Sequence, residues 1–227
     1  MERQAAVLGP LLERYTGRRA PRVLDCACGI GTQTLGLAAR GHDLVGSDLS
    51  RASVARAQRE ARLRALEVPL HVADMRDLSS LPAQNFDAVL AADNALPHLL
   101  LKEDRDRALR EMADRLRPDG ILAVTLRDYD RLIQTRPTMQ EPSFFGERSR
   151  RRIVHQVWDW EGTEYDVHLY ISFESGAGWV TKHFVSRYHA LLREDLNASL
   201  RTIGFTDIQW LEPDVSSFYQ PVVIARR

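Results

Sequence analysis

The stretch Val23-Leu24-Asp25-Cys26-Ala27-Cys28-Gly29-Ile30-Gly31-Thr32-Gln33 decides how the rest of this 227-residue chain is interpreted. The short run that ends at Leu24 predicts a buried strand, an acid and a glycine-bearing turn follow it, and the apolar pattern at 33–40 predicts a helix. In this arrangement backbone N–H groups can meet a nucleotide-like ligand at the N-terminus of the helix. We therefore expect a nucleotide-like ligand at this turn.

The glycine pattern distinguishes two kinds of nucleotide cofactor. Gly29 and Gly31 lack a Cβ and allow close approach of a ligand, but Thr34 stands where a dinucleotide fingerprint has its third glycine. Asp25 would repel a pyrophosphate, whereas its carboxylate can receive the amino end of a methionine moiety. The pattern thus favours S-adenosylmethionine, with a nicotinamide-dependent dehydrogenase as the competing class of enzyme.

Strands and helices alternate over the first 127 residues. A helical pattern interrupted by Gly9-Pro10 covers 2–16, further strands are expected at 43–48, 69–72, 86–91 and 121–126, and further helices at 51–65 and 102–116. This alternation predicts an α/β, Rossmann-like, mostly parallel sheet with helices on both faces, whose ligands bind at the carboxyl ends of the strands. Polar residues fall at those ends: Asp25, Asp48, Asp74, Asp93 with Asn94, and Arg127 with Asp128. A single such acid is most simply a cap of the next turn or helix, but four in succession favour one shared ligand.

The alternation stops after residue 127. Strand-like segments at 150–160, 165–174 and 179–188, the first two divided by a Glu161-Gly162-Thr163 turn, predict an antiparallel β meander that is added to the main sheet as a lid over the pocket. Its aromatic residues Trp158, Trp160, Tyr165 and Tyr170 are interpreted as the core of the meander rather than a cage for a cation. A helix at 191–203 and strands at 207–211 and 221–225 follow. We expect one domain over 1–227, with a cofactor-binding core at 1–127, a β-rich, substrate-covering insertion at 128–188, and the last helix and strands of the core at 189–227.

Composition and charge exclude several partners. The chain has 31 basic and 31 acidic residues, so no net field favours nucleic acid or an anionic membrane. No segment is long and apolar enough to span a membrane, and no signal peptide is visible, so we expect a cytoplasmic protein with a small-molecule partner and leave its oligomeric state open. Only Lys102 and Lys182 are lysines, a bias that suggests a GC-rich bacterial source.

Two further clusters have simple interpretations. Cys26 and Cys28 have no other cysteines to join them, so no disulfide framework or metal site is expected. The basic run Arg148, Arg150, Arg151 and Arg152 is interpreted as a solvated strand edge, and any function of it is left open.

These motifs in this order resemble class I S-adenosylmethionine-dependent methyltransferases along the whole chain, and Gly204-Phe205-Thr206-Asp207-Ile208 before a last strand is similar to the usual end of that family. Asp93-Asn94-Ala95-Leu96-Pro97-His98-Leu99 and Arg127-Asp128-Tyr129-Asp130 resemble small-molecule N-methyltransferases of the glycine/sarcosine type. The resemblance implies methyl transfer to a small polar acceptor, with an amine or amino acid as the favoured acceptor. A small-molecule O-methyltransferase and a non-catalytic cofactor-binding protein are the alternatives.

The resemblance also implies roles for single residues. On the cofactor, Asp25, Gly29, Gly31 and Thr32 would border the methionine part, Asp48 would accept the ribose hydroxyls, Leu49 and Met75 would lie near the adenine, Asp74 would receive its amine, and Asp93 would lie beneath the sulfonium. Asp74 has an alternative role as a surface partner of Arg76. On the acceptor, the implied residues are His98, Asn94, Arg127 and Tyr129, with Arg127 suited to a carboxylate because of its planar fork.

Overall fold

The computed structural model describes residues 1–81, 85–147, 150–176 and 178–227, which form two compact units. The first unit comprises Met1–Leu96, Leu101–Asp128 and Arg193–Arg227, and the second comprises Pro97–Leu100 and Tyr129–Leu192. Of the predicted basic run, Arg148 lies outside the described residues.

Within the described part of the first unit, seven strands form one sheet in the order β10-β11-β5-β4-β1-β2-β3. Their bounds are β1 (Arg22–Asp25), β2 (Asp43–Asp48), β3 (Leu70–Val72), β4 (Phe86–Ala91), β5 (Leu116–Thr125), β10 (Asp207–Leu211) and β11 (Val222–Arg226). Strands β1 to β5 are parallel, β11 runs antiparallel to β5, and β10 runs antiparallel to β11. The predicted mostly parallel sheet is confirmed.

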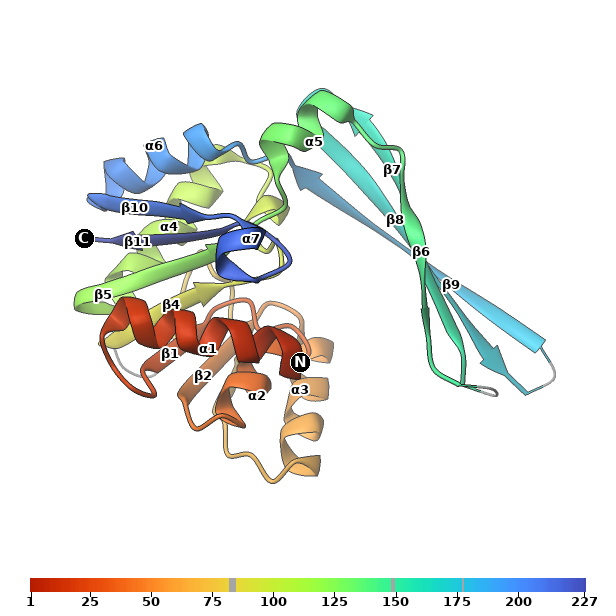
Figure 1. Ribbon diagram of the computed structural model, residues 1–227, viewed down its shortest axis with the longest axis horizontal. Coiled ribbons are helices and arrows are strands. Elements are labelled where there is room, and N and C mark those ends of the chain that lie inside the picture. Colours follow the sequence, from red (N-terminus) through yellow and green to blue (C-terminus); the bar gives the residue numbers. More distant parts are fainter. Residues whose placement is uncertain (82–84, 148–149, 177) are drawn as a thin grey trace. The chain divides into compact units, whose positions relative to one another are not determined.

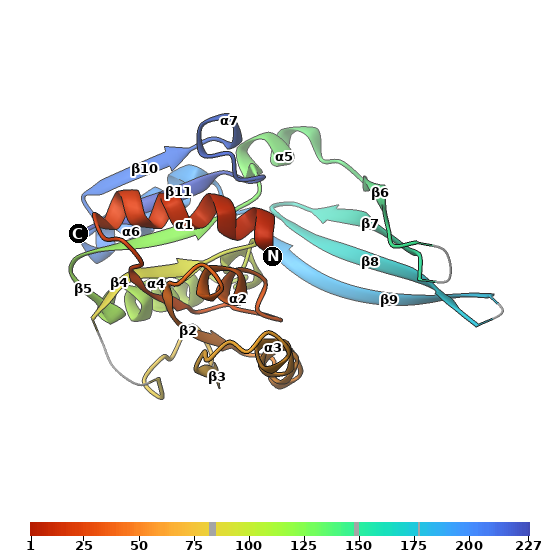
Figure 2. The same ribbon diagram turned by 60° about the horizontal axis from the view of Figure 1, so that its bottom comes forward.

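Helices cover both faces of this sheet (Figures 1 and 2). They are α1 (Glu2–Thr16), α2 (Thr32–Ala38), α3 (Arg51–Leu63), α4 (Lys102–Arg115), α6 (Arg193–Ile203) and the short α7 (Pro213–Ser216), together with a 3₁₀ turn at Leu96–His98. On one face, Leu8 and Leu12 of α1 pack against alternate residues of the central strands, such as Leu90 of β4. Strand β4 is buried at every position, as expected for a parallel strand that is covered on both sides.

Two details of the first unit differ from the sequence-based expectation. The pattern interrupted at Gly9-Pro10 allows a bent helix or two short ones, and the structure has one helix, α1, that is continuous through Pro10. Strand β5 begins at Leu116 rather than Ile121, and it absorbs Pro118-Asp119-Gly120 where its pairing with β4 shifts register. Asp119 adopts a φ of 63° there, so what reads as a turn in the sequence is an irregularity within a longer strand.

The described residues of the second unit form a separate antiparallel sheet in the order β6-β7-β8-β9. Its strands are β6 (Met139–Phe145), β7 (Arg152–Glu161), β8 (Glu164–Ser175) and β9 (Gly178–His189), preceded by helix α5 (Tyr129–Thr135). The meander and its turn at Gly162 are confirmed, but the expectation that its strands join the main sheet is wrong. The sequence did not predict α5 or β6, because every residue of β6 is exposed and Pro142 interrupts its strand pattern.

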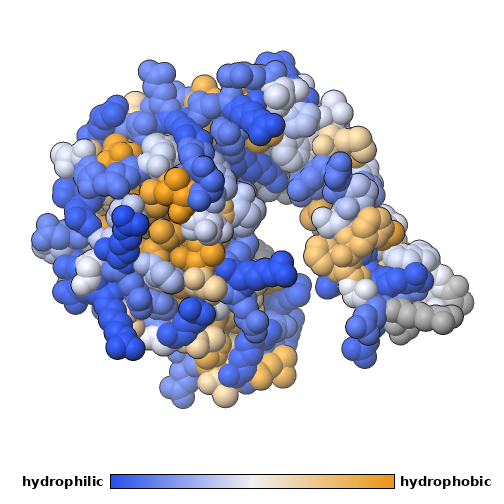
Figure 3. Space-filling view, in the orientation of Figure 1, coloured by the Kyte–Doolittle hydropathy of each residue, from blue (hydrophilic) through white to orange (hydrophobic). Residues whose placement is uncertain are grey.

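The aromatic residues of this unit separate into two groups. Trp158 and Tyr165 are buried and Trp160 stacks on Tyr165 with ring centroids 4.4 Å apart, so these three form a core as predicted. Tyr170 instead stacks between two histidines, with its ring centroid 4.9 Å from that of His155 and 4.5 Å from that of His183. Figure 3 shows apolar side chains on the visible surface of this unit. The exposed large hydrophobic residues of its sheet, on either face, are Met139, Phe144, Phe145, Trp179, Val180, Phe184 and Val185.

None of the described helices is long and apolar enough to cross a membrane.

Candidate functional site

The carboxyl edge of the parallel sheet gathers three of the predicted acids within the first unit. Asp25 is the last residue of β1, Asp48 is the last residue of β2, and Asp93 follows β4 by two residues. Because these strands are parallel neighbours, their carboxyl ends meet at one edge. The three carboxylates are close enough that Asp93 and Asp48 both raise the pKa of Asp25.

The glycine turn between β1 and α2 provides the open side of this edge. Gly29 and Gly31 have φ values of 53° and 88°, in the region that favours glycine. A Cβ at Gly31 would lie 2.8 Å from Cγ of Leu35, whereas a Cβ at Gly29 would meet no atom within 4 Å. The turn therefore needs Gly31 for packing and leaves free space above Gly29, and Thr32 begins α2 directly after it.

Asp25 is fully buried beside this turn. Thr34 donates a hydrogen bond to its Oδ2 at 2.6 Å, and the backbone N–H of Ala27 donates to its Oδ1 at 3.3 Å. Burial is the main cause that raises the pKa of Asp25 from its ordinary value of 3.8 to about 7, and these two hydrogen bonds oppose the rise.

Asp48 is held by two backbone amides. Gly29 donates to its Oδ2 at 2.9 Å and Ser50 donates to its Oδ1 at 2.8 Å, so the carboxylate fixes both the glycine turn and the start of α3. The predicted capping role is therefore real. It does not exclude a ligand, because each carboxylate oxygen can accept a second hydrogen bond. Leu49, the predicted adenine contact, has 68% of its surface exposed.

Asp93 lies in a strained turn that the sequence does not reveal. Asp93 and Asn94 have φ values of 56° and 67°, which are uncommon for residues other than glycine. Thr125 of β5 stabilises the turn, since its Oγ1 accepts from N–H of Asp93 at 2.8 Å and its carbonyl accepts from N–H of Asn94 at 3.1 Å.

Two side chains that sequence reasoning missed hold the carboxylate of Asp93. Gln33 of α2 donates from Nε2 to Oδ2 of Asp93 at 2.6 Å, and the hydroxyl of Tyr219 donates to Oδ1. The available signals are weak, because Gln33 is one polar residue in a helix and Tyr219 stands in the loop before β11.

The acids at this edge lack cationic partners. Across the described ranges, no salt bridge involves Asp25, Asp48 or Asp93. The donors that fix their positions are neutral. These three carboxyl groups and the open space at Gly29 fit a cofactor with a sulfonium and an ammonium group. Among the described residues, no group of three or more His, Cys, Asp or Glu side chains could hold a metal ion.

Asp74 differs from these three acids. Arg76 donates to both of its oxygens, with Nη2 to Oδ2 at 2.7 Å, and this hydrogen bonding lowers the pKa of Asp74. Arg76 also pairs with Asp104 at 2.9 Å. The surface pairing considered as the alternative is thus present, and Met75, half-buried, lies between the two partners in sequence.

The four predicted acceptor residues fall in both units. In the first unit, Oδ1 of Asn94 accepts from the backbone N–H of Arg127 at 3.2 Å, so the structure brings these two residues together. In the second unit, the ring of His98 lies 4.1 Å from that of Tyr188, and His98 is exposed. Tyr129 is buried, and its hydroxyl shares a hydrogen bond with that of Tyr165 at 2.9 Å.

Cys26 and Cys28 are free and buried, as expected from their small number. Burial raises the pKa of both thiols, so they stay protonated and pack beside the glycine turn.

Residues 23–120 match a protein family described as a methyltransferase domain. The chain is 39% identical over 115 residues to the glycine/sarcosine N-methyltransferase of Parasynechococcus marenigrum (strain WH8102), which covers 51% of this chain and 41% of that enzyme. It is 34% identical over 122 residues to the dTDP-3-amino-3,6-dideoxy-alpha-D-glucopyranose N,N-dimethyltransferase of Streptomyces fradiae, which covers 54% and 45%. The chain therefore spans less than half of the length of these two relatives.

Solved structures of methyltransferases share the fold of this chain. DesVI of Streptomyces venezuelae has a TM-score of 0.84 at 20% identity, over 98% of this chain and 89% of that chain. CalS10, an amino pentose methyltransferase from Micromonospora echinaspora solved with S-adenosylmethionine, has a TM-score of 0.79 at 21% identity, over 100% and 91%. The comparisons confirm the predicted fold and the predicted resemblance to S-adenosylmethionine-dependent methyltransferases.

Proposed function

We propose that this chain, in which residues 23–120 carry a methyltransferase domain, transfers the methyl group of S-adenosylmethionine to the nitrogen of a small polar amine. The observation that carries the proposal is the carboxyl edge of the sheet. There Asp25, Asp48 and Asp93 have no arginine or lysine partner among the described residues, beside free space above Gly29. A cationic, nucleotide-like cofactor matches both the charge and the backbone geometry of this edge.

The proposed cofactor contacts follow from the geometry of each residue. Asp48 has acceptor capacity left for the ribose hydroxyls, and Gly29 lets a ligand approach the backbone. Gly31 and Thr32 shape the turn, while Asp25 and Asp93 supply negative charge near the methionine part. Leu49, Asp74 and Met75 remain proposed adenine contacts, with Asp74 sharing its oxygens with Arg76.

The proposed methyl transfer requires little general acid–base catalysis by the protein. The cofactor supplies an already activated methyl group, so the residues of the site contribute alignment and a fixed electrostatic field. Alignment of two reactants can supply about 7–11 kcal/mol of the barrier. An amine that arrives deprotonated needs no strong base, whereas a phenol acceptor would need a base such as His98.

The acceptor is proposed to be an amine because the two named relatives both act on amines, a glycine or sarcosine in one case and an amino sugar in the other. Asn94 and Arg127 in the first unit, and His98 and Tyr129 in the second, are the proposed acceptor residues. A guanidinium suits a carboxylate or a phosphate, so Arg127 is compatible with an amino acid and with a nucleotide-linked amino sugar. Buried Tyr129 would act through packing with Tyr165.

Two measurements test this proposal. Isothermal titration calorimetry should show binding of S-adenosylmethionine and no binding of NAD. Transfer of a labelled methyl group should then be screened over glycine, sarcosine, a dTDP-linked amino sugar, a phenol and a carboxylic acid. Transfer to an amine supports the proposal, and transfer to the phenol alone supports an O-methyltransferase. Tight cofactor binding without transfer to any acceptor would favour the non-catalytic alternative.

A further inference from the structure

In the turn that follows β4, hydrogen bonds hold the side chain of Asp93 as well as the backbone. Asp93 and Asn94 both occupy the left-handed region, a conformation that costs energy for residues with a side chain. Thr125 fixes the backbone of the turn through its hydroxyl and its carbonyl. Gln33 and Tyr219 hold only the side chain of Asp93, so they fix a carboxylate rather than the fold of the turn.

Both of these donors are neutral, and Gln33 is itself fixed. Gln33 is 3% exposed, and its Nε2 also donates to Oε1 of Gln4 in α1 at 2.9 Å. Tyr219 has 57% of its surface exposed. Partial burial and then the hydrogen bond to Asp93 raise its pKa, and Arg127 opposes the rise, so the hydroxyl remains a donor throughout the physiological pH range. Two neutral donors thereby hold the carboxylate of Asp93 in place.

We propose that Tyr219 and Gln33 are positioning residues that hold the carboxylate of Asp93 at the cofactor's charged end, so that the site favours S-adenosylmethionine over its demethylated product. The inference rests on the proposed function and concerns residues to which no role was assigned above. The two ligands differ by one methyl group and one positive charge. A fixed anion discriminates between them, whereas an anion that can turn away or be neutralised by an arginine discriminates less.

This arrangement gives the site a simple order of affinities. Methyl transfer removes the positive charge that the carboxylate would face, so this contact contributes less to binding of the product than to binding of the substrate cofactor. An arginine in place of Tyr219 or Gln33 would hold the carboxylate equally well and would abolish this difference. This difference in binding is therefore a physical reason for the two donors to Asp93 to be neutral.

The test compares the dissociation constants of S-adenosylmethionine and S-adenosylhomocysteine, measured by calorimetry, in wild type and in Tyr219→Phe. We expect Tyr219→Phe to weaken the binding of S-adenosylmethionine at least fivefold, and that of S-adenosylhomocysteine less than twofold. Tyr15→Phe is the matched control, because the hydroxyl of Tyr15 donates to Gln209 at 3.3 Å in the same unit and away from Asp93. This control should leave both constants unchanged.

A second variant guards against misfolding of the first. Gln33→Leu removes the other donor at similar volume and should shift the ratio of the two constants in the same direction. In an Asp93→Asn background, Tyr219→Phe should no longer change the ratio, because the charge that it positions is gone. An unchanged ratio in a folded Tyr219→Phe protein, or equal weakening of both ligands, would overturn the inference while leaving the proposed function intact. Failure of the wild-type chain to bind S-adenosylmethionine would instead overturn the proposed function, and the inference with it.

Discussion

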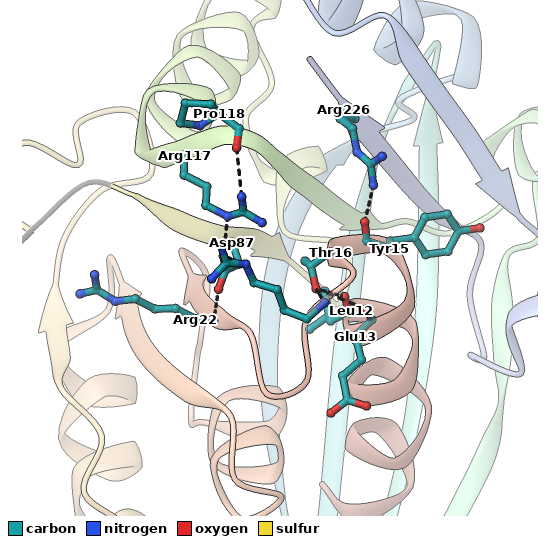
Figure 4. A network of polar contacts seen from close by, with 10 residues as sticks. Leu12, Glu13, Tyr15, Thr16, Arg22, Asp87, Arg117, Pro118 and Arg226 are labelled. Atoms are coloured by element: carbon teal, nitrogen blue, oxygen red, sulfur yellow. Dashed lines mark hydrogen bonds and ion pairs between the residues drawn. The ribbon is translucent and has the colours of Figure 1, made fainter.

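The acids at the two ends of the parallel sheet differ in the charge of the groups that hold them. At the start of β4, Asp87 is 5% exposed and accepts hydrogen bonds from the backbone N–H of Arg22 at 2.8 Å and from Nε of Arg117 (Figure 4). It also forms an ion pair with Arg18, whose Nε lies 3.1 Å from its Oδ1. This carboxylate is balanced by two arginines and joins segments from 18–22, 87 and 117.

At the other end of the same strands, Asp25, Asp48 and Asp93 are held by backbone amides and by Thr34, Gln33 and Tyr219, none of which carries a charge. The buried Asp25 has its pKa raised to about 7, so its negative charge is costly in the folded chain. Asp87 is thus paired with arginines, whereas neutral donors position the three acids that we propose for the cationic cofactor.

The largest effect is expected for Asp25 and appears in the pH dependence of stability. Because the folded-state pKa of Asp25 lies above its unfolded value of 3.8, the folded chain binds more protons between about pH 4 and pH 7. The free energy of unfolding should therefore fall as pH rises through this range, by up to about 4 kcal/mol at about 1.4 kcal/mol per pKa unit. Asp25→Asn should remove this loss, as measured by urea unfolding at pH 5 and pH 8.

The control for Asp25 is Asp114→Asn, because Asp114 is an exposed carboxylate in the same unit. It should leave the pH dependence as in the wild type. If Asp25→Asn shows the same slope as the wild type, the charge of Asp25 is not what costs stability, and the contrast between the two ends of the sheet loses its energetic basis.

Removal of Asp87 should affect stability and leave the cofactor site unchanged. Asp87→Ala deprives Arg117 and the N–H of Arg22 of their acceptor in a largely buried place, which should cost about 2–4 kcal/mol of unfolding free energy. The affinity for S-adenosylmethionine should stay within twofold of the wild type by calorimetry. Weaker cofactor binding with unchanged stability would reverse the roles that we assign to the two ends.

Asp48 should show the opposite pattern. Asp48→Ala should weaken binding of S-adenosylmethionine by about 1.5–3 kcal/mol, the scale of hydrogen bonds to a charged group. Asp43→Ala is the matched control at the other end of β2. The side chain of Asp43 is 66% exposed, and its Oδ2 lies 3.5 Å from Nε of Arg22. Unchanged affinity in a folded Asp48→Ala protein would show that Asp48 only caps the turn.

The smallest effect is expected for the cation at the acidic end. Arg127→Lys keeps the positive charge and loses the planar fork, so catalytic efficiency toward an anionic acceptor should fall about tenfold, or about 1.4 kcal/mol, with cofactor affinity nearly intact. Steady-state kinetics with the acceptor that emerges from the screen measures this change. If Arg127→Ala leaves that efficiency unaltered, a neutral acceptor becomes the better hypothesis.

Much of the first unit could be predicted because its signals are local. The bounds of β4 at Phe86–Ala91 and β10 at Asp207–Leu211 coincide with the expected strands. Apolar runs and glycine turns report short-range backbone preferences, so they place the strands and the acids that follow them. Strand β6 gave no such signal because it is an exposed edge strand.

The sequence by itself determined where the strands of the first unit lie along the chain. It also determined that β1 and β2 end in an acid and that an acid follows β4, because these features depend on neighbouring residues. Only the tertiary structure decided which acids are neutralised. Asp87 meets Arg18 and Arg117, Asp74 meets Arg76 and Asp104, and Asp93 meets Gln33 and Tyr219, the last across 126 residues of chain. No local pattern encodes such pairings, because the partner of a carboxylate depends on which strand ends and loops the packed sheet brings within hydrogen-bonding distance.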